Sequence, residues 1–107
     1  MWFSTYGERV NLQGWGECVT TTGYGDLFSS DVNGLYTSWF NGTSSASPIV
    51  AGAAAALSSA LEAKTAKPAR PRDVRRILEA TGTPHVGTHN IGPLPDLVAA
   101  FQRAHVP

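Results

Sequence analysis

The residue in this sequence best suited to nucleophilic chemistry is a serine that follows a glycine turn. Residues 41–48 read Asn-Gly-Thr-Ser-Ser-Ala-Ser-Pro, and a run of small and apolar residues comes next. Because Gly42 permits a tight turn, Ser44 is expected at the start of a helix, held by the backbone and exposed at its tip. The free N–H groups and the positive dipole end of that helix point to the same place. Such a site can stabilise an oxyanion that develops on a substrate carbonyl.

The helix that must position this serine is predicted from the spacing that follows. Apolar residues recur at helical intervals, and the other faces are also small or apolar, which is typical of a buried helix. The residues at helical spacing are Ala46, Ile49, Val50, Ala53, Ala54 and Leu57. The small faces, with Gly52 among them, are expected to let neighbouring backbone come close. Pro48 fits in the first helical turn, so the helix is expected to begin near residues 43–45.

The remaining elements are predicted from alternation, turn residues and caps. Residues 8–13 alternate polar and apolar, which indicates a short half-buried strand; residues 19–22 and 35–40 are β-prone, and 28–34 are expected to form a loop. Pro71 is placed to begin a second helix that Gly82 ends, with Val74, Ile77 and Leu78 as its apolar stripe. Asp96 is expected to cap a last helix.

Composition excludes several classes of protein. The chain has 107 residues, eight basic and eight acidic side chains, and 42% hydrophobic residues, so it is neither globally basic nor composed like a disordered chain. A single cysteine, Cys18, excludes an internal disulfide and is expected to be a buried small residue. The uncharged run between Asp31 and Glu62 contains glycines, Pro48 and many serines, so no membrane span is expected. The first residues do not form a secretory signal, so the compartment of this chain stays open.

Residues 42–52, Gly-Thr-Ser-Ser-Ala-Ser-Pro-Ile-Val-Ala-Gly, resemble the nucleophile motif of subtilisin-like serine peptidases (peptidase family S8). The resemblance implies that Ser44 is the nucleophile and that its own backbone N–H donates to the oxyanion. It also implies that Asn41, Gly42 and Thr43 support the oxyanion site and the rim that binds a polypeptide substrate. The implied reaction is peptide-bond hydrolysis through an acyl-enzyme.

The resemblance covers nearly the whole chain but only the last part of a peptidase domain. Residues 3–12 resemble the stretch before the nucleophile, with 13–16 (Gln-Gly-Trp-Gly) departing from the Ala-Pro-Gly of many members. Residues 71–81 resemble the later surface helix of the family, and residues 92–97 resemble its closing segment. The implied fold class is therefore α/β: residues 1–107 are the C-terminal portion of a three-layer αβα domain with a mostly parallel sheet. Members of the family are mostly secreted, which is the expectation for the parent.

The family's aspartate and histidine motifs lie upstream of the serine, and neither occurs in this sequence. Because a serine hydroxyl is a poor nucleophile without a base, the isolated chain is expected to be inactive. It is also expected to be only marginally stable, because the family's sheet would lose several strands and the alanine-rich helix much of its cover. Two alternatives stay open: a non-catalytic subunit or inactive relic of a peptidase, and a module that binds an acidic partner through the basic residues of 64–76. A solvated helix face is the favoured interpretation of that basic stretch, so no nucleic-acid partner is expected. The oligomeric state is not predicted.

Three further interpretations concern polar residues outside the motif. His85, His89 and His105 all follow the serine and are interpreted as surface histidines. No cofactor is expected. Structural calcium occurs in the family, but Asp26, Asp31 and Asn33 match no defined calcium loop and are interpreted as turn residues. Phe40, next to the glycine turn, is expected to contact the leaving-group side of a substrate.

Overall fold

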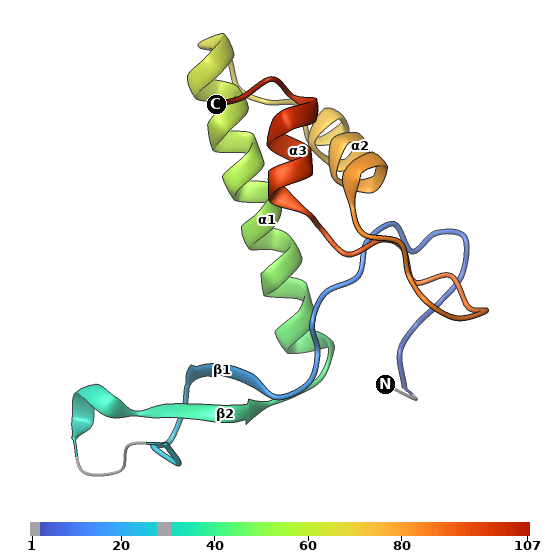
Figure 1. The fold of residues 1–107 in the computed structure, drawn as a ribbon. Helices are drawn as coiled ribbons and strands as arrows, with labels where there is room; N and C mark the ends of the chain where they lie inside the picture. The colour runs from blue at the N-terminus through green and yellow to red at the C-terminus, as the bar shows by residue number, and fades with distance from the viewer. Residues whose placement is uncertain (1–2, 28–30) are drawn as a thin grey trace.

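The chain folds into a β-hairpin and three helices that are joined at the start of the longest helix (Figure 1). The computed structural model describes residues 3–27 and 31–107. Strands β1 (Val19–Thr22) and β2 (Tyr36–Phe40) form one antiparallel sheet, and a 3-10 turn at Val32–Gly34 lies between them. Helices α1 (Thr43–Thr65), α2 (Pro71–Thr81) and α3 (Leu97–Arg103) follow. The structure is thus mixed helix and strand.

The hairpin contains the two β-prone segments of the sequence. Val19 pairs with Phe40 and Thr22 with Tyr36, with an irregularity in the register between Val19 and Thr21. The strand expected at residues 19–22 is confirmed, and the one expected at 35–40 begins one residue later. Of the expected loop at 28–34, residues 28–30 lie outside the described part of the chain. Asp31 caps the 3-10 turn by accepting from the backbone N–H of Asn33 at 2.9 Å.

Helix α1 begins at Thr43, within the expected range, and ends where Ala66 adopts a left-handed conformation (φ 56°). Pro48 lies in the second turn of this helix and not in the first, so that expectation is wrong. Because proline has no N–H, the carbonyl of Ser44 lacks its usual donor four residues later. The N-cap, Gly42, has no side chain that could accept from the first N–H groups of the helix. The backbone carbonyl of Gly42 accepts from the N–H groups of Ser45 and Ala46 instead.

The expectation that α1 is buried on all sides is wrong for this chain. Only Ser45, Ala53 and Leu57 are buried in the helix, and Ile49 is 39% exposed. No atom lies within 4 Å of the position where a Cβ on Gly52 would stand, so the expected close approach of backbone is not seen there. In Figure 1, α2 and α3 cover only the C-terminal half of α1, and extended chain lies beside the other half.

One helix of the described residues, α1, is long and apolar enough to cross a membrane by length and composition. Its most apolar 18-residue window has a mean hydropathy of 1.3. The expectation that the chain contains no membrane span stays a prediction. Core helices of soluble proteins meet the same criterion, so the finding is weak evidence for a span.

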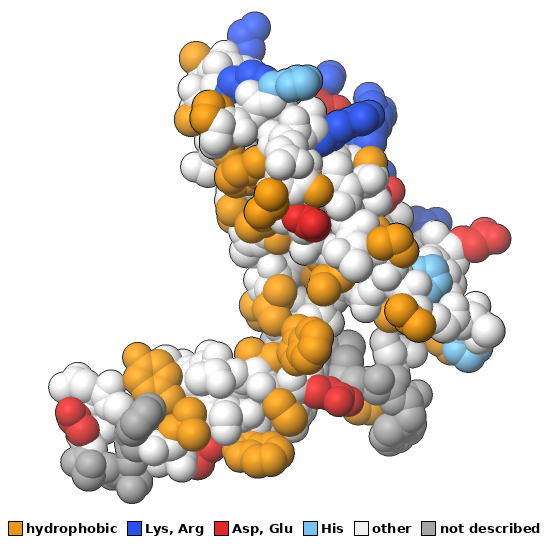
Figure 2. Space-filling view, viewed as in Figure 1, with side chains coloured by type: hydrophobic (Ala, Val, Ile, Leu, Met, Phe, Trp, Pro, Cys, Tyr) orange, Lys and Arg blue, Asp and Glu red, His pale blue; other side chains and the backbone are white. Residues whose placement is uncertain are grey.

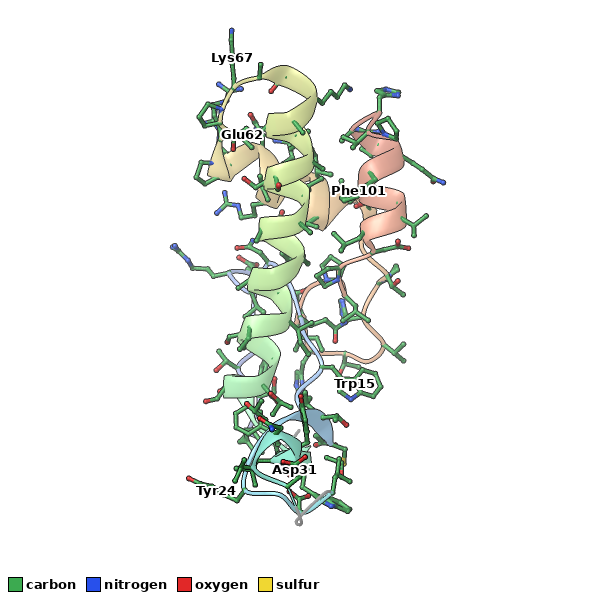
Figure 3. All side chains as sticks on the ribbon, turned by 90° about the vertical axis from the view of Figure 1, so that its left-hand side faces the viewer. Trp15, Tyr24, Asp31, Glu62, Lys67 and Phe101 are labelled. Carbon is green, nitrogen blue, oxygen red and sulfur yellow. The ribbon has the colours of Figure 1, made fainter. Side chains whose placement is uncertain are left out.

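The core lies where the three helices meet and confirms the predicted helix faces. Leu57 is fully buried there, together with Val74, Leu78 and Ala100, and Phe101 of α3 packs against the cluster (Figure 3). Pro71 begins α2 and Gly82 ends it, as predicted. The carboxylate of Asp96 accepts from the N–H of Ala99 at 3.0 Å and caps α3, also as predicted.

Residues 8–13 do not form a strand, which corrects the prediction from their alternation. Glu8 and Arg9 lie in a turn that Val10 closes by donating its N–H to the carbonyl of Gly7 at 3.0 Å. Residues 10–13 have no regular secondary structure, and Gln13 donates its N–H to the carbonyl of Pro93 at 3.0 Å. A strand needs a partner strand for its backbone groups, and the described residues provide none here. The described part of the chain likewise contains no parallel strand pair.

The molecule is open for its length. Its radius of gyration is 16.2 Å, against about 13 Å for a compact domain of this size. Its accessible surface is 7663 Å², whereas a compact monomer of this mass exposes about 5700 Å². About a quarter of its surface is therefore in excess of what a closed domain would expose.

Candidate functional site

The turn that carries Ser44 is built on the backbone of Gly42. Gly42 has φ 102° and ψ 179°, a conformation open almost only to glycine. Its N–H donates to the carbonyl of Gly16 at 2.7 Å. Its carbonyl accepts from the N–H of Ser45 at 3.0 Å and from the N–H of Ala46 at 3.3 Å. Both the N–H and the carbonyl of Gly42 are therefore hydrogen-bonded, and these bonds fix the turn.

The three serines of this turn have different environments. Ser44 is exposed, and its hydroxyl has no partner among the described residues. Ser45 is 3% exposed, and its hydroxyl donates to the carbonyl of Gly42 at 2.8 Å. Ser47 is exposed and lines a groove beside the helix. The hydroxyl of Ser44 is thus free to reach a substrate, while that of Ser45 is engaged in holding the turn.

The start of α1 offers two backbone donors next to this serine. Within the described part of the chain, the N–H groups of Thr43 and Ser44 donate to no acceptor. The first N–H groups of a helix have no intrahelical partner, and the helix dipole adds partial positive charge there. A carbonyl oxygen that gains negative charge beside Ser44 would be stabilised by these groups.

Asn41 connects the turn to the segment before β1. Its Oδ1 accepts from the backbone N–H of Cys18 at 2.6 Å, and Cys18 has a positive φ of 51°. Together with the bond between Gly42 and Gly16, this contact ties the two sides of the hairpin together up to Gly42, the N-cap of α1. Cys18 is exposed, so the expectation that it is buried is wrong.

A groove of about 680 Å³ runs along α1 from the turn toward the core. Thr43, Ala46, Ser47 and further α1 residues as far as Ala54 form one wall, and residues 10–17 form much of the other. The walls come close at Gly14, where an added Cβ would clash with the backbone carbonyl of Ala46. Residues 14–17 are not among the site residues predicted from the sequence. The departure of residues 13–16 from the Ala-Pro-Gly pattern is a signal for the first three of them.

The histidines are not arranged to activate Ser44. None of the three lines the groove, and none bonds to Ser44 in the described part of the structure. His89 stacks on the ring of Tyr6, with centroids 4.0 Å apart. His105 follows Ala104, whose carbonyl accepts from Nζ of Lys64 near the far end of α1, about 30 Å from Ser44 along the helix.

The acidic residues of the hairpin accept hydrogen bonds from backbone groups of the hairpin itself. Asp31 caps the 3-10 turn, and a carboxylate oxygen of Asp26 accepts from the N–H of Ser38 at 3.4 Å. The described residues contain no group of three or more His, Cys, Asp or Glu that could hold a metal ion. The 3-10 turn that Asp31 caps lies at the end of the hairpin away from α1 (Figure 1).

A comparison with models of protein families matches residues 2–94 to the subtilase family, peptidase family S8. The chain belongs to the subtilase family. The match includes the glycine turn, all of α1 and α2, and the segment that returns past residues 11–13. At the level of the family, the chemistry of this subtilase is that of a serine peptidase and hydrolase. A search of the curated proteins found no match to the chain.

Proposed function

We propose that this subtilase chain carries the nucleophile, Ser44, of a serine endopeptidase that cleaves polypeptides through an acyl-enzyme. In this proposal, residues 1–107 are the C-terminal part of the catalytic domain. The histidine that takes the proton of Ser44 and the aspartate that orients it come from a part of the parent protein outside these residues. The observation that supports the proposal most directly is the free hydroxyl of Ser44 beside two unpaired backbone donors.

The residues before Ser44 are proposed to support the reaction rather than to perform it. Gly42 fixes the direction of the turn, and Asn41 ties it to Cys18 at the rim of the site. The N–H of Ser44 is proposed as one donor to the oxyanion, and Thr43 lies on the wall of the groove beside it. Phe40, 40% exposed at the end of β2, is proposed to contact the leaving-group side of the substrate.

We further propose that the complete domain has the three-layer αβα fold with a mostly parallel sheet. One face of α1 and residues of the segment 10–13, which pairs with no strand among the described residues, border the same groove, with Val10, Leu12, Val50 and Ala54 in its apolar lining. A strand seated there would pair with that segment and cover the helix. The excess accessible surface of the chain is consistent with such a missing layer.

Without the rest of the domain, the chain is expected not to hydrolyse peptides. The described residues place no base beside Ser44 to accept its proton, and a neutral serine hydroxyl reacts slowly at pH 7. The exposed helix face and the open edges of the hairpin are also expected to promote association of the isolated chain.

The test is covalent labelling of Ser44 by a fluorophosphonate, followed by mass spectrometry of the labelled peptide. The chain is produced alone and together with the protein segment that its source DNA encodes immediately upstream. We expect labelling and peptide hydrolysis only for the combined protein, and loss of both in Ser44→Ala.

Ser47→Ala is the matched control, because Ser47 lies on the same helical turn and is also exposed. It is expected to keep the label. Labelling of Ser47, or hydrolysis that survives Ser44→Ala, would refute the assignment of the nucleophile. If the upstream DNA encodes no segment with the Asp and His motifs, the chain is not part of a complete peptidase of this kind.

A further inference from the structure

The sequence contains two Asn-Gly steps, Asn33–Gly34 in the hairpin and Asn41–Gly42 directly before the nucleophile turn. Asparagine is thermolabile, and it is most reactive before glycine, because glycine has no side chain to hinder the approach of its own nitrogen. That nitrogen attacks Cγ of the asparagine, the side-chain nitrogen leaves as ammonia, and a succinimide ring forms. Water then opens the ring to aspartate or to isoaspartate.

Both reacting groups of Asn41–Gly42 are engaged by one short segment of the chain, residues 16–18. The N–H of Gly42, whose nitrogen would attack, donates to the carbonyl of Gly16 at 2.7 Å, and Gly16 is buried. The side-chain Oδ1 of Asn41, on the amide that would be attacked, accepts from the backbone N–H of Cys18 at 2.6 Å. Ring formation must therefore break the bond to Gly16 and turn an amide that Cys18 holds.

The other step, Asn33–Gly34, is engaged at its backbone only. The N–H of Gly34 donates to the carbonyl of Asp31 at 2.9 Å, within the 3-10 turn. The side chain of Asn33 is exposed, and its amide forms no hydrogen bond with the described residues. The amide of Asn33 can therefore rotate toward the nitrogen of Gly34, and a single local turn has to open for the ring to form.

The charges around the two steps are similar, so hydrogen bonding is the feature that separates them. Attack requires the glycine nitrogen to lose its proton, which a nearby cation favours and a nearby anion opposes. The sequence has no Lys or Arg between Arg9 and Lys64, and Figure 2 shows most of the basic side chains at the end of the molecule away from the hairpin. Each step has one carboxylate in the segment that bonds it, Asp31 or Glu17.

We propose that the folded chain deamidates first at Asn33, and that residues 16–18 shield Asn41–Gly42 from the same reaction. The modification site is thus in the turn of the hairpin, whereas the shielded step lies three residues before Ser44. Isoaspartate at position 41 would lengthen the backbone of the nucleophile turn, and aspartate would place a negative charge beside the N–H groups proposed to stabilise an oxyanion. That consequence for catalysis rests on the proposed function, but the reaction itself does not.

The experiment incubates the chain at mildly alkaline pH and low concentration, in buffer and in concentrated urea, and follows both sites by peptide mapping with mass spectrometry. Each rate in buffer is divided by the rate of the same site in urea, which removes the effect of neighbouring residue types. We expect the normalised rate at Asn41 to be lower than that at Asn33 by about fivefold or more, the factor that one further net hydrogen bond supplies.

Gly14→Ala tests the shield without changing either Asn-Gly step. A Cβ on Gly14 would clash with the backbone carbonyl of Ala46, so the segment that continues into residues 16–18 has to move. We expect this variant to lose the protection of Asn41 and to keep the rate at the hairpin site. Gly52→Ala is the matched control, because its Cβ enters open space on the helix that carries Ala46, and it should change neither rate.

Equal normalised rates at the two sites would overturn the inference. A faster reaction at Asn41 than at Asn33 would also overturn it, because the N–H of Cys18 would then activate the amide instead of holding it. Protection that survives in a folded Gly14→Ala variant would show that residues 16–18 are not the shield. If that variant does not fold, the comparison of the two sites in the wild type decides alone. None of these results depends on peptide hydrolysis, so the proposed function is tested separately.

Discussion

Two residues of α1, Leu57 and Ile49, separate the covered part of this helix from the open part. Leu57 is fully buried in the cluster where α1, α2 and α3 meet. Ile49, two turns earlier, is 39% exposed and lies outside that cluster. The same change to alanine is therefore expected to have very different effects at the two positions.

Leu57→Ala removes the central residue of a small core. Leu→Ala substitutions at buried sites cost about 3 to 5 kcal/mol, because the lost burial adds to the cavity left behind. Only Val74, Leu78 and Ala100 accompany Leu57 as buried residues of this cluster, so little remains to hold α2 and α3 on α1. Ile49→Ala is expected to cost at most about 1 kcal/mol in the isolated chain, since the side chain is partly solvated and alanine favours helix.

The assay is hydrogen exchange by mass spectrometry on the isolated chain at low concentration. A loss of 3 kcal/mol lowers amide protection by more than about a hundredfold. We expect this loss in α2 and α3 for Leu57→Ala, and a change of less than about fivefold for Ile49→Ala. Equal effects of the two substitutions would refute the account of the core.

Three further substitutions test local features. Gly42→Ala has room for its Cβ, whose nearest neighbour is the N atom of Ser44 at 3.9 Å; its cost of about 1 to 3 kcal/mol is therefore conformational, and exchange of the first α1 amides should report it. Ser45→Ala should cost about 1 kcal/mol or less by the same measurement, because the Gly42 carbonyl keeps two backbone donors. Asp96→Ala should cost about 1 kcal/mol and increase exchange at Ala99, whose N–H it caps, whereas an unchanged rate there would contradict the capping role.

Several elements of this chain follow from short-range rules that the sequence displays directly. The strand at Val19–Thr22, the start of α1 at Thr43, the proline start of α2 and the aspartate cap of α3 all match the prediction. Each depends on the conformational preference of one residue or on a bond between near neighbours. The family follows in the same way, because its motif is a continuous run of residues.

The errors concern features whose partners are distant in the chain. Residues 8–13 alternate like a strand, yet a strand exists only where another strand pairs with it. The apolar pattern of α1 predicts a helix that can be buried, but what covers its faces depends on which layers are present. Cys18 was expected inside, whereas the hairpin irregularity and the bond to Asn41 place it on the surface.

Most local elements, the family and the position of the serine after the glycine turn could be predicted from the sequence. Each of these depends on residues that are adjacent or nearly adjacent in the chain. The tertiary contacts were needed to establish that Ser44 is free while Ser45 is bonded, and that the core is confined to one end of α1. The reason is physical: exposure, packing and proximity are set by contacts between segments that lie far apart in the chain, and no local pattern encodes them.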